Sequence, residues 1–504
     1  MNIADILETA AHNFPDNLAI IDEKTELTFG QLNCKSNKIA SQLVKNGVSP
    51  GDHVALIAPN SSDWVIFYFG VLKAGAVAVT LAFTMTADEL QPLLEESGPK
   101  VVFTVDGKKD NITRGSYMQT VICDHGDLSF SDMLENGSDQ FKNIDRNPDD
   151  TAAVLYTSGT TALPKGVMLT HENIMTSVHN VVYHERSCEN DSAVCFLPLN
   201  HVFAQIHILN ATISSAGMLV IHPSFDMNKF LLSIQEFKIT KLYAVPTIYI
   251  RMLSLSDIKE KLGSVRYCFS AAASMAQEVV RGWKLTTGLD IFEAYGMTES
   301  ASMVTFNHYK KHVTGSVGTP AHGIAVQIRD TKGNILGNNT KGEVCISGPN
   351  IMKGYLKRPC ETKDAFWGKW FRSGDVGIID DNSYLYIVDR IKELIITGGE
   401  NVSPREIEEV LYTRKEVEEC AVIGLPDREY GERITAFIIP KNSHAIDPHE
   451  LKRYLKTRLS PFKIPKEFIM VSELPKNSTG KLLKRELREQ FSKSRLEKIK
   501  NIWG

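Results

Sequence analysis

Two patterns of apolar residues alternate along the first half of this chain. Apolar residues have helical spacing over residues 29–43, 63–72 and 87–95. Short apolar runs typical of buried strands occupy residues 53–57, 77–80 and 101–104. Pro92 weakens the expectation of a helix only in the third helical stretch. Because helical and strand-like segments alternate, the pattern predicts an α/β fold with parallel strands.

The segment from Leu155 to His171, LYTSGTTALPKGVMLTH, follows this alternation. Apolar runs at 152–156 and 167–169 predict two strands, and the connection between them is dense in hydroxyl groups. Small residues allow backbone N–H groups to converge on one point, and Lys165 adds a cation, so the loop suits a polyphosphate. A polar hairpin turn is the alternative. The loop is not a Walker motif, because Gly166 is followed by Val167 and a strand-like run.

Three later segments combine small, aromatic and ionisable residues. Residues 197–203, PLNHVF with a preceding Leu, open a helical stretch, and His201 taken alone favours a buried, hydrogen-bonded histidine over a catalyst. Residues 270–273 end a strand with side chains small enough for a flat ligand to approach. Residues 293–299, EAYGMTE, follow a strand at 290–293. Their tyrosine, hydroxyl and carboxylate suit a base, a phosphate and Mg²⁺, and a surface turn is the alternative.

Past residue 315 the spacing becomes β-rich and is punctuated by glycine. Asp375, after Gly374 at the expected end of a strand, is well placed to accept hydrogen bonds from ribose hydroxyls, and an ordinary turn aspartate is equally compatible with the pattern. A charged segment followed by Gly398-Gly399 indicates a connector between domains. Ser403-Pro404 predicts the start of a helix.

The tail is predicted to be a small α+β unit. Residues 451–504 hold fifteen Lys/Arg and five Asp/Glu, and a charge run of this kind is usually a solvated face. Within it, residues 474–481 form a glycine-containing loop that presents Lys481.

Composition narrows the class of protein. At 504 residues the chain is too long for one core, and 43% apolar and 23% charged residues are ordinary for a globular protein. A net charge of −4 provides no basic field for nucleic acid. The eight cysteines show no CxxC spacing and indicate reduced thiols. The start lacks a signal peptide, and Lys73 inside the apolar stretch 64–83 favours a buried helix and strand over a membrane span, so we expect a cytoplasmic protein.

Taken together, these segments resemble the adenylate-forming superfamily of acyl-CoA synthetases, peptide-synthetase adenylation domains and luciferases. The resemblance is carried, in family order, by TSGTTALPKG, PLNHVF, EAYGMTES, RSGDVG, DRIKELIITGGENVSPREIE and PKNSTGK. It covers most of the chain. Three residues depart from the common pattern: Ala162 and Ala271 stand where glycine is frequent, and Ser373 replaces a common threonine.

The resemblance implies a large, multi-subdomain N-terminal α/β domain over 1–389, a hinge at 390–392 and a small mobile α+β lid over 393–504. It also implies ATP, Mg²⁺ and CoA as cofactors or cosubstrates. Tyr295 would pack on adenine, Asp375 and Arg390 would fix the ribose, Glu299 would hold Mg²⁺, and Lys481 would bridge the carboxylate and the α-phosphate.

The remaining residues implied by the resemblance fall into three groups. Catalysis would also involve Thr298 and His201. Nucleotide binding would involve Thr157, Ser158, Gly159, Thr160, Thr161, Lys165, Ala272, Glu293, Ala294 and Gly296. The hinge and the CoA site would involve Lys392, Gly398, Gly399, Glu400 and Asn401.

The acid and the acceptor are the least determined parts. Residues 200–217 contain no Asp or Glu to pair an α-ammonium group, and burying an unpaired ammonium is costly, which disfavours an amino acid. The apolar stretch suits a medium- or long-chain fatty acid or a ring. CoA is the preferred acceptor, an acyl carrier protein is the alternative, and we expect a monomer or homodimer.

Overall fold

The hairpin at the expected phosphate loop belongs to the first of two large sheets. The structure is a computed structural model, and it describes residues 1–112, 115–116, 118, 120–157, 164–271, 275–427, 429–441, 446–476 and 481–491. The first sheet has the order β18 (Gly354–Tyr355), β8 (Lys165–Thr170), β7 (Thr151–Thr157), β4 (Val77–Thr80), β3 (His53–Ile57), β5 (Val101–Thr104), β6 (Thr120–Ile122). The strands β7, β4, β3, β5 and β6 are parallel, whereas β8 returns antiparallel to β7.

The second large sheet carries the other expected strands. Its order is β15 (Thr319–Pro320), β14 (Ser302–Phe306), β13 (Ile291–Met297), β12 (Tyr267–Ser270), β11 (Lys241–Ala244), β9 (Ser192–Cys195), β10 (Met218–Ile221), β1 (Leu18–Ile21), β2 (Glu26–Thr28). From β13 through β1 the neighbouring strands are parallel. The α/β class and the parallel strands predicted from the apolar pattern are therefore confirmed.

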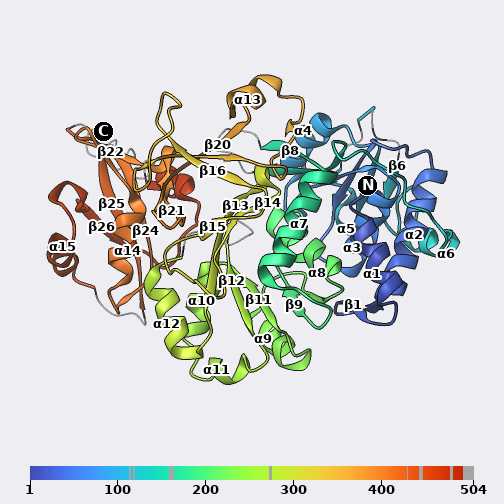
Figure 1. The fold of residues 1–504 in the computed structure, drawn as a ribbon, viewed down its shortest axis with the longest axis horizontal. Helices are drawn as coiled ribbons and strands as arrows, with labels where there is room; N and C mark the ends of the chain where they lie inside the picture. Colours follow the sequence, from blue (N-terminus) through green and yellow to red (C-terminus); the bar gives the residue numbers. More distant parts are fainter. Residues whose placement is uncertain are drawn as a thin grey trace, which may run out of the picture.

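Helices cover these sheets and fill the space between them (Figure 1). The helices of this region are α1 (Asp5–Asn13), α2 (Phe29–Lys45), α3 (Ser62–Lys73), α4 (Ala87–Ser97), α5 (Asp106–Lys109), α6 (Phe130–Asn136), α7 (His171–Glu185), the π-helix η1 (Phe203–Asn210), α8 (Ala211–Ser214), α9 (Met227–Glu236), α10 (Pro246–Leu253), α11 (Ile258–Lys261), α12 (Gln277–Thr287) and the 3₁₀ turn η2 (Thr298–Ser300). Helix α7 contacts both β8 and β14, so it lies between the two sheets.

Local sequence explains why these helices begin and end where they do. Thr28 and Thr86 each form a capping box at the start of α2 and α4. Helix α4 continues past Pro92 because Leu90, Leu93 and Leu94 are buried against the sheet. The apolar stretch at 64–83 is α3 followed by β4, as expected, and no described helix is long and apolar enough to cross a membrane.

Two smaller sheets follow along the chain. The first has the order β16 (Ala325–Arg329), β17 (Gly342–Ser347), β20 (Trp370–Ile379), β19 (Phe366–Trp367), with β21 (Leu385–Arg390) pairing β20 and the helix α13 (Pro359–Asp364) beside it. The second has the order β23 (Glu400–Val402), β22 (Ile395–Thr397), β25 (Gly431–Pro440), β24 (Val417–Asp427), with β26 (Glu467–Met470) pairing β25. The 3₁₀ turn η3 (Ile391–Glu393) joins the two sheets.

The last sheet and its helices form a small α+β unit at one end of the molecule, coloured orange to red (Figure 1). Its helices are α14 (Pro404–Tyr412), α15 (Pro448–Lys456), the 3₁₀ turn η5 (Pro461–Lys463) and the helical residues 484–491. Apolar clusters within residues 395–491 are separate from the main cluster, which extends from Ile3 to Leu385. The large and small units match the expected fold class, and the exact division at 390–392 stays a prediction.

Candidate active site

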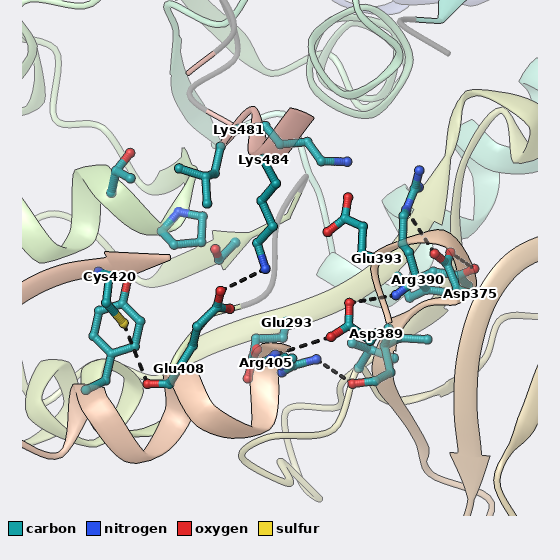
Figure 2. Close-up of a pocket in the computed structure, with 18 of the residues that line it drawn as sticks. Glu293, Asp375, Asp389, Arg390, Glu393, Arg405, Glu408, Cys420, Lys481 and Lys484 are labelled. Atoms are coloured by element: carbon teal, nitrogen blue, oxygen red, sulfur yellow. Dashed lines mark hydrogen bonds and ion pairs between the residues drawn. The ribbon is translucent and has the colours of Figure 1, made fainter. Parts of the chain in front are cut away.

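A cavity of ≈ 270 Å³ lies where the small C-terminal unit meets the second large sheet (Figure 2). Its walls come from β13, β20, β21, α10, α14, β24 and the C-terminal tail. Its polar and charged lining residues include Ser270, Glu293, Tyr295, Asp375, Asp389, Arg390, Glu393, Arg405, Glu408, Lys481 and Lys484. Seven of the expected site residues line this cavity: Glu293, Ala294, Tyr295, Gly296, Asp375, Arg390 and Lys481.

Asp375 is the centre of a polar cluster in this cavity. The Tyr295 hydroxyl donates to Asp375 Oδ2 at 2.6 Å, and Arg390 Nε lies 3.0 Å from Asp375 Oδ1. Asp375 is buried, and its charge raises the pKa of Arg390. Burial, and then the charge of Asp375, raises the pKa of the Tyr295 phenol well above its ordinary value. A carboxylate, a phenol and a guanidinium from distant parts of the sequence thus form one fixed group.

The backbone around this cluster differs from two expectations. The strand expected at 290–293 continues to Met297, because β13 pairs antiparallel with β14 through its second half. Asp375 was expected at the end of a strand, but it lies inside β20 and pairs in register with Arg390 of β21. The register places Asp375 and Arg390 side by side, which the sequence pattern alone does not reveal.

Gly296 and Glu293 of β13 lie in a closely packed wall of the cavity. A Cβ atom at Gly296 would lie 1.8 Å from the Ser302 carbonyl oxygen, so only glycine fits here. Glu293 accepts a hydrogen bond from the Gly315 N–H at 3.4 Å. Burial raises the pKa of Glu293 to about 7, although the charge of Arg405 lowers it in part.

Lys481 enters the cavity from the C-terminal tail (Figure 2). Burial, and then the charge of Arg390, lowers the pKa of its ammonium group to about 8. His201 is half-buried, and its Nδ1 accepts a hydrogen bond from the Phe203 N–H at 3.3 Å. Burial, and then the charge of Lys481, lowers the pKa of His201 to about 4, so this imidazole is neutral at pH 7. His201 is thus both hydrogen-bonded and near Lys481.

A second polar group lies at the base of the β7–β8 hairpin. Thr157 and Lys165 pair across this hairpin, and Lys165 forms an ion pair with Glu361 of α13. The Lys165 ammonium also lies 4.9 Å from the Tyr355 ring centroid, and the Tyr355 hydroxyl donates to Glu299 Oε1 at 3.0 Å. Tyr355 therefore joins the expected phosphate-binding lysine to the expected metal ligand.

Several expected site residues cannot be placed in this way. Ser158, Gly159, Thr160, Thr161 and Ala272 lie outside the described residues. Thr298 is buried in η2 next to Glu299. The described part of the chain contains no group of three or more His, Cys, Asp or Glu that could hold a metal ion.

Gly398 and Gly399 do not form the expected connector between domains. They are the two central residues of the turn between β22 and β23, with φ of 58° and 85°. A two-residue hairpin turn favours positive φ at both positions, which explains the paired glycines. Glu400, Asn401 and Lys392 are exposed, and none of the described residues lining the cavity comes from this hairpin.

The π-helix η1, expected to line the acyl site, contains more buried polar side chains than its apolar pattern indicated. His207 Nε2 lies 2.7 Å from Glu185 Oε1, and both side chains are fully buried. Glu185 also lies 3.2 Å from Lys241 Nζ and accepts a hydrogen bond from the Tyr243 hydroxyl. The carboxylate of Glu185 is thus already compensated by a buried cation.

Sequence reasoning missed Tyr355, Glu361, Asp389, Arg405, Glu408 and Lys484. The Ser403 hydroxyl donates to Asp389 Oδ2 at 2.7 Å, which fixes the start of α14 against β21. Asp389, Arg405 and Glu408 lie within the segment DRIKELIITGGENVSPREIE, which gave them no role, and Tyr355, Glu361 and Lys484 lie outside the segments that carry the resemblance.

Two large sheets enclosing a helical layer, followed by a small α+β unit that brings a lysine to the cavity, define the class of adenylate-forming enzymes. Comparison with known proteins agrees. Residues 7–356 match the model of the AMP-binding enzyme family, and residues 406–481 match that of the AMP-binding enzyme C-terminal domain. The chain belongs to the AMP-binding enzyme family and is an AMP-forming acyl-CoA synthetase of the adenylate-forming superfamily.

The similarity to known proteins extends over nearly the whole chain. An oxalate–CoA ligase of Arabidopsis thaliana is 35% identical, covering 97% of this chain and 98% of the relative. A long-chain-fatty-acid–CoA ligase of Mycobacterium tuberculosis is 33% identical, covering 97% and 99%. Among solved structures, ATP-bound MatB from Rhodopseudomonas palustris is 33% identical with a TM-score of 0.91, covering 97% and 99%. Apo MatB, with the same identity and coverage, has a TM-score of 0.81, so the present structure is more similar to the ATP-bound form.

Proposed function

We propose that this enzyme uses ATP to activate a carboxylic acid, preferably a straight-chain fatty acid, and then transfers the acyl group to CoA. In the first half-reaction a carboxylate oxygen attacks the α-phosphorus of ATP, the bond to the β-phosphate oxygen breaks, and pyrophosphate leaves. In the second, the CoA thiol loses its proton and its sulfur attacks the acyl carbonyl carbon. AMP then leaves with the carboxylate oxygen that formed the adenylate.

The observation that carries this proposal is the shared cavity of Lys481 and the Asp375 cluster. Asp375 and Arg390 would bind the ribose hydroxyls, and Tyr295 would pack against adenine. Lys481 would lie between the acid and the α-phosphate, where negative charge increases in the transition state. A preorganised cation in a buried site stabilises such charge more strongly than it does in water.

Lys165, Thr157 and residues 158–161 would bind the β- and γ-phosphates. The contact between Lys165 and Glu361 supports this role, because an incoming polyphosphate can replace Glu361 as the anion beside the lysine. When Mg²⁺ is bound, it would neutralise phosphate charge beside Glu299 and Thr298. His201 is uncharged at pH 7. It would contact the acid and would not compete with Lys481 for the carboxylate.

The small C-terminal unit would turn about residues 390–392 between the two half-reactions. Lys481 and α14 belong to this unit, so turning would remove the lysine after adenylation and bring another face to the cavity. The exposed hairpin of Gly398, Gly399, Glu400 and Asn401 would then approach CoA. Its present exposure supports this proposal, because a segment that binds only in the second half-reaction need not be covered in the first.

The preference for an uncharged, medium-length acyl chain is supported by η1 and Ala271. No Asp or Glu occurs between residues 200 and 217, and Glu185, which contacts His207 of η1, is compensated by Lys241. Ala271 is buried directly after β12, and its methyl group would narrow the acyl site there. Each methylene that fits adds about 0.8 kcal/mol of burial. An aryl acid is the second candidate, because the buried Phe203, His207, Phe269 and Phe306 rings pack together here.

Thioester formation from a panel of acids tests this function. Straight-chain acids from acetate upward, oxalate and benzoate are compared, each with CoA and with a holo acyl carrier protein as acceptor. We expect kcat/KM to rise with chain length, fall where the site ends, and depend on CoA. A maximum at benzoate would make this an aryl-CoA ligase, a maximum at oxalate would overturn the uncharged site, and transfer only to the carrier protein would overturn CoA as the acceptor.

A further inference from the structure

The tail that carries Lys481 is attached to α14 by a buried ion pair. Lys484 Nζ lies 2.7 Å from Glu408 Oε1, and the two side chains are only 11% and 15% exposed. The same oxygen accepts a hydrogen bond from the Val422 N–H of β24 at 2.7 Å. Glu408 and Lys484 line the cavity into which Lys481 points (Figure 2). Three residues beyond Lys481, the chain is therefore held to both α14 and β24.

Pro475 and Lys476 also contact the chain that follows Lys481. Lys476 and Leu482 form an antiparallel bridge, and the Leu483 N–H donates to the Pro475 carbonyl at 2.8 Å. Lys476 Nζ lies 2.8 Å from Glu419 Oε2. These contacts bring the two ends of the loop together, so that Lys481 extends from a closed base rather than from a free tail.

Such anchoring matters because the surroundings of Lys481 are unfavourable to a cation before ATP binds. Burial and the charges of Arg390 and Lys392 lower the pKa of its ammonium group, and Glu393 and Asp375 compensate only in part. The charged form of Lys481 is therefore less favourable in this cavity than it is in water. The contacts of Lys484 add a fixed point three residues beyond Lys481.

Lys484 itself is suited to anchoring and not to binding phosphate. Burial disfavours its charge, but Glu408 and then Asp389 outweigh that cost and raise the pKa of Lys484 above its ordinary value. Its ammonium is already hydrogen-bonded to a carboxylate. The raised pKa keeps the Lys484 ammonium charged across the range of pH in which the enzyme would work.

We propose that Glu408 and Lys484 are positioning residues that hold Lys481 in the cavity during adenylation and have no part in thioester formation. This inference rests on the proposed function. All three residues belong to the C-terminal unit, so the ion pair moves with Lys481 when that unit turns. The ion pair fixes the position of Lys481 relative to α14.

The test compares the two half-reactions in Glu408→Gln and Lys484→Met, alone and combined with Lys481→Ala. Glu408→Gln is the primary variant, because it keeps the side-chain shape and an acceptor for the Val422 N–H. We expect kcat for acid-dependent pyrophosphate release to fall about tenfold to a hundredfold, as misplacement by 1 Å does in other sites. The KM for ATP, and thioester formation from preformed acyl-adenylate and CoA, should stay within about twofold.

Three controls make the result specific. Glu406→Gln removes another ion pair of α14, which Glu406 forms with Lys463 at 2.5 Å. Neither residue is among the described residues that line the cavity. This variant should leave both half-reactions unchanged. In the Lys481→Ala background, Glu408→Gln should cause no further loss, because the ion pair acts only through Lys481. Lys484→Arg keeps the charge and should retain most of the adenylation activity.

Three results would overturn this inference: unchanged adenylation in Glu408→Gln, equal loss of both half-reactions, or a further loss in the Lys481→Ala background. A wild-type enzyme that releases no pyrophosphate in response to any acid would refute the proposed function, and this inference with it. The wild-type measurement therefore distinguishes the two failures.

Discussion

The pH dependence of adenylation provides a sensitive test of the environment of Lys481. Burial and the nearby Arg390 lower the pKa of this ammonium group from 10.5 to about 8 in the ligand-free cavity. The group is charged below that pKa and neutral above it. Only the charged form can bridge a carboxylate and a phosphate, so adenylation should lose activity as the pH rises through 8.

The size of the effect follows from the fraction of charged lysine. With a pKa of about 8 this fraction falls about thirtyfold between pH 7 and pH 9.5, whereas a lysine at the ordinary pKa would lose only about a tenth of its charge. Because kcat/KM reports groups of the free enzyme, it is the quantity that should follow this titration.

The assay measures kcat/KM for ATP from acid-dependent pyrophosphate release between pH 6 and pH 10, in the wild type and in Lys481→Arg. A guanidinium group stays charged over this range, so the variant should have a lower maximum but no decline above pH 8. A wild-type kcat/KM that stays nearly constant up to pH 9.5, as a lysine at the ordinary pKa requires, would refute the reasoning, and so would an identical decline in Lys481→Arg.

Three further predictions concern residues around the same cavity. Burial raises the pKa of Glu293 from 4.5 to about 7. The folded protein therefore holds this proton more tightly than the unfolded chain does. The free energy of unfolding should fall by about 3 kcal/mol as the pH rises from 4.5 to 7. Denaturant unfolding should show this loss in the wild type and not in Glu293→Gln, and parallel curves would contradict it. Tyr295→Phe removes the hydroxyl that donates to Asp375. It should raise the KM for ATP about tenfold and leave the KM for the acid unchanged, since a hydrogen bond to a charged group contributes about 1.5–3 kcal/mol. Equal changes in the two KM values would argue against a nucleotide-specific role. Lys392→Pro fixes φ near about −65° in the turn between the two units and should preserve adenylate formation while abolishing transfer to CoA, whereas equal loss of both would indicate misfolding.

Periodicity alone predicted much of the N-terminal architecture. The runs at 53–57, 77–80 and 101–104 are β3, β4 and β5, with the same bounds in the structure. These segments are predictable because each is short, apolar and buried on both faces, as strands of a parallel sheet are. The helix at 404–412 was equally accessible from its Ser-Pro start.

Pairing across long stretches of sequence was not predictable in the same way. Asp375 seemed to end a strand because Gly374 precedes it, but its place is set by pairing with β21, and Gly374 has a φ of 72° within β20. The paired glycines at 398 and 399 indicated a connector, although the same residues suit a hairpin turn, and only the register of β22 with β23 distinguishes the two.

The candidate site likewise contains residues that were predictable from the sequence and residues that were not. Tyr295, Asp375, Arg390 and Lys481 were expected from their motifs, and the structure places all four at one cavity. Glu408 and Lys484, which we propose hold Lys481 in place, were not expected. Glu408 ends the segment DRIKELIITGGENVSPREIE, which does not reveal its partner, and Lys484 belongs to none of the quoted segments. Lys484 lies in a basic tail that resembles a solvated surface, and its burial depends on a carboxylate 76 residues earlier in the sequence.

The transfer of oxygen from acid to AMP tests the central claim most directly. The enzyme is supplied with ATP, CoA and a fatty acid labelled with ¹⁸O at both carboxylate oxygens, and the AMP formed is examined by mass spectrometry. If the carboxylate attacks the α-phosphorus, each AMP carries one ¹⁸O atom, and the pyrophosphate carries none. Unlabelled AMP, or the formation of ADP and phosphate, would contradict an acyl-adenylate intermediate.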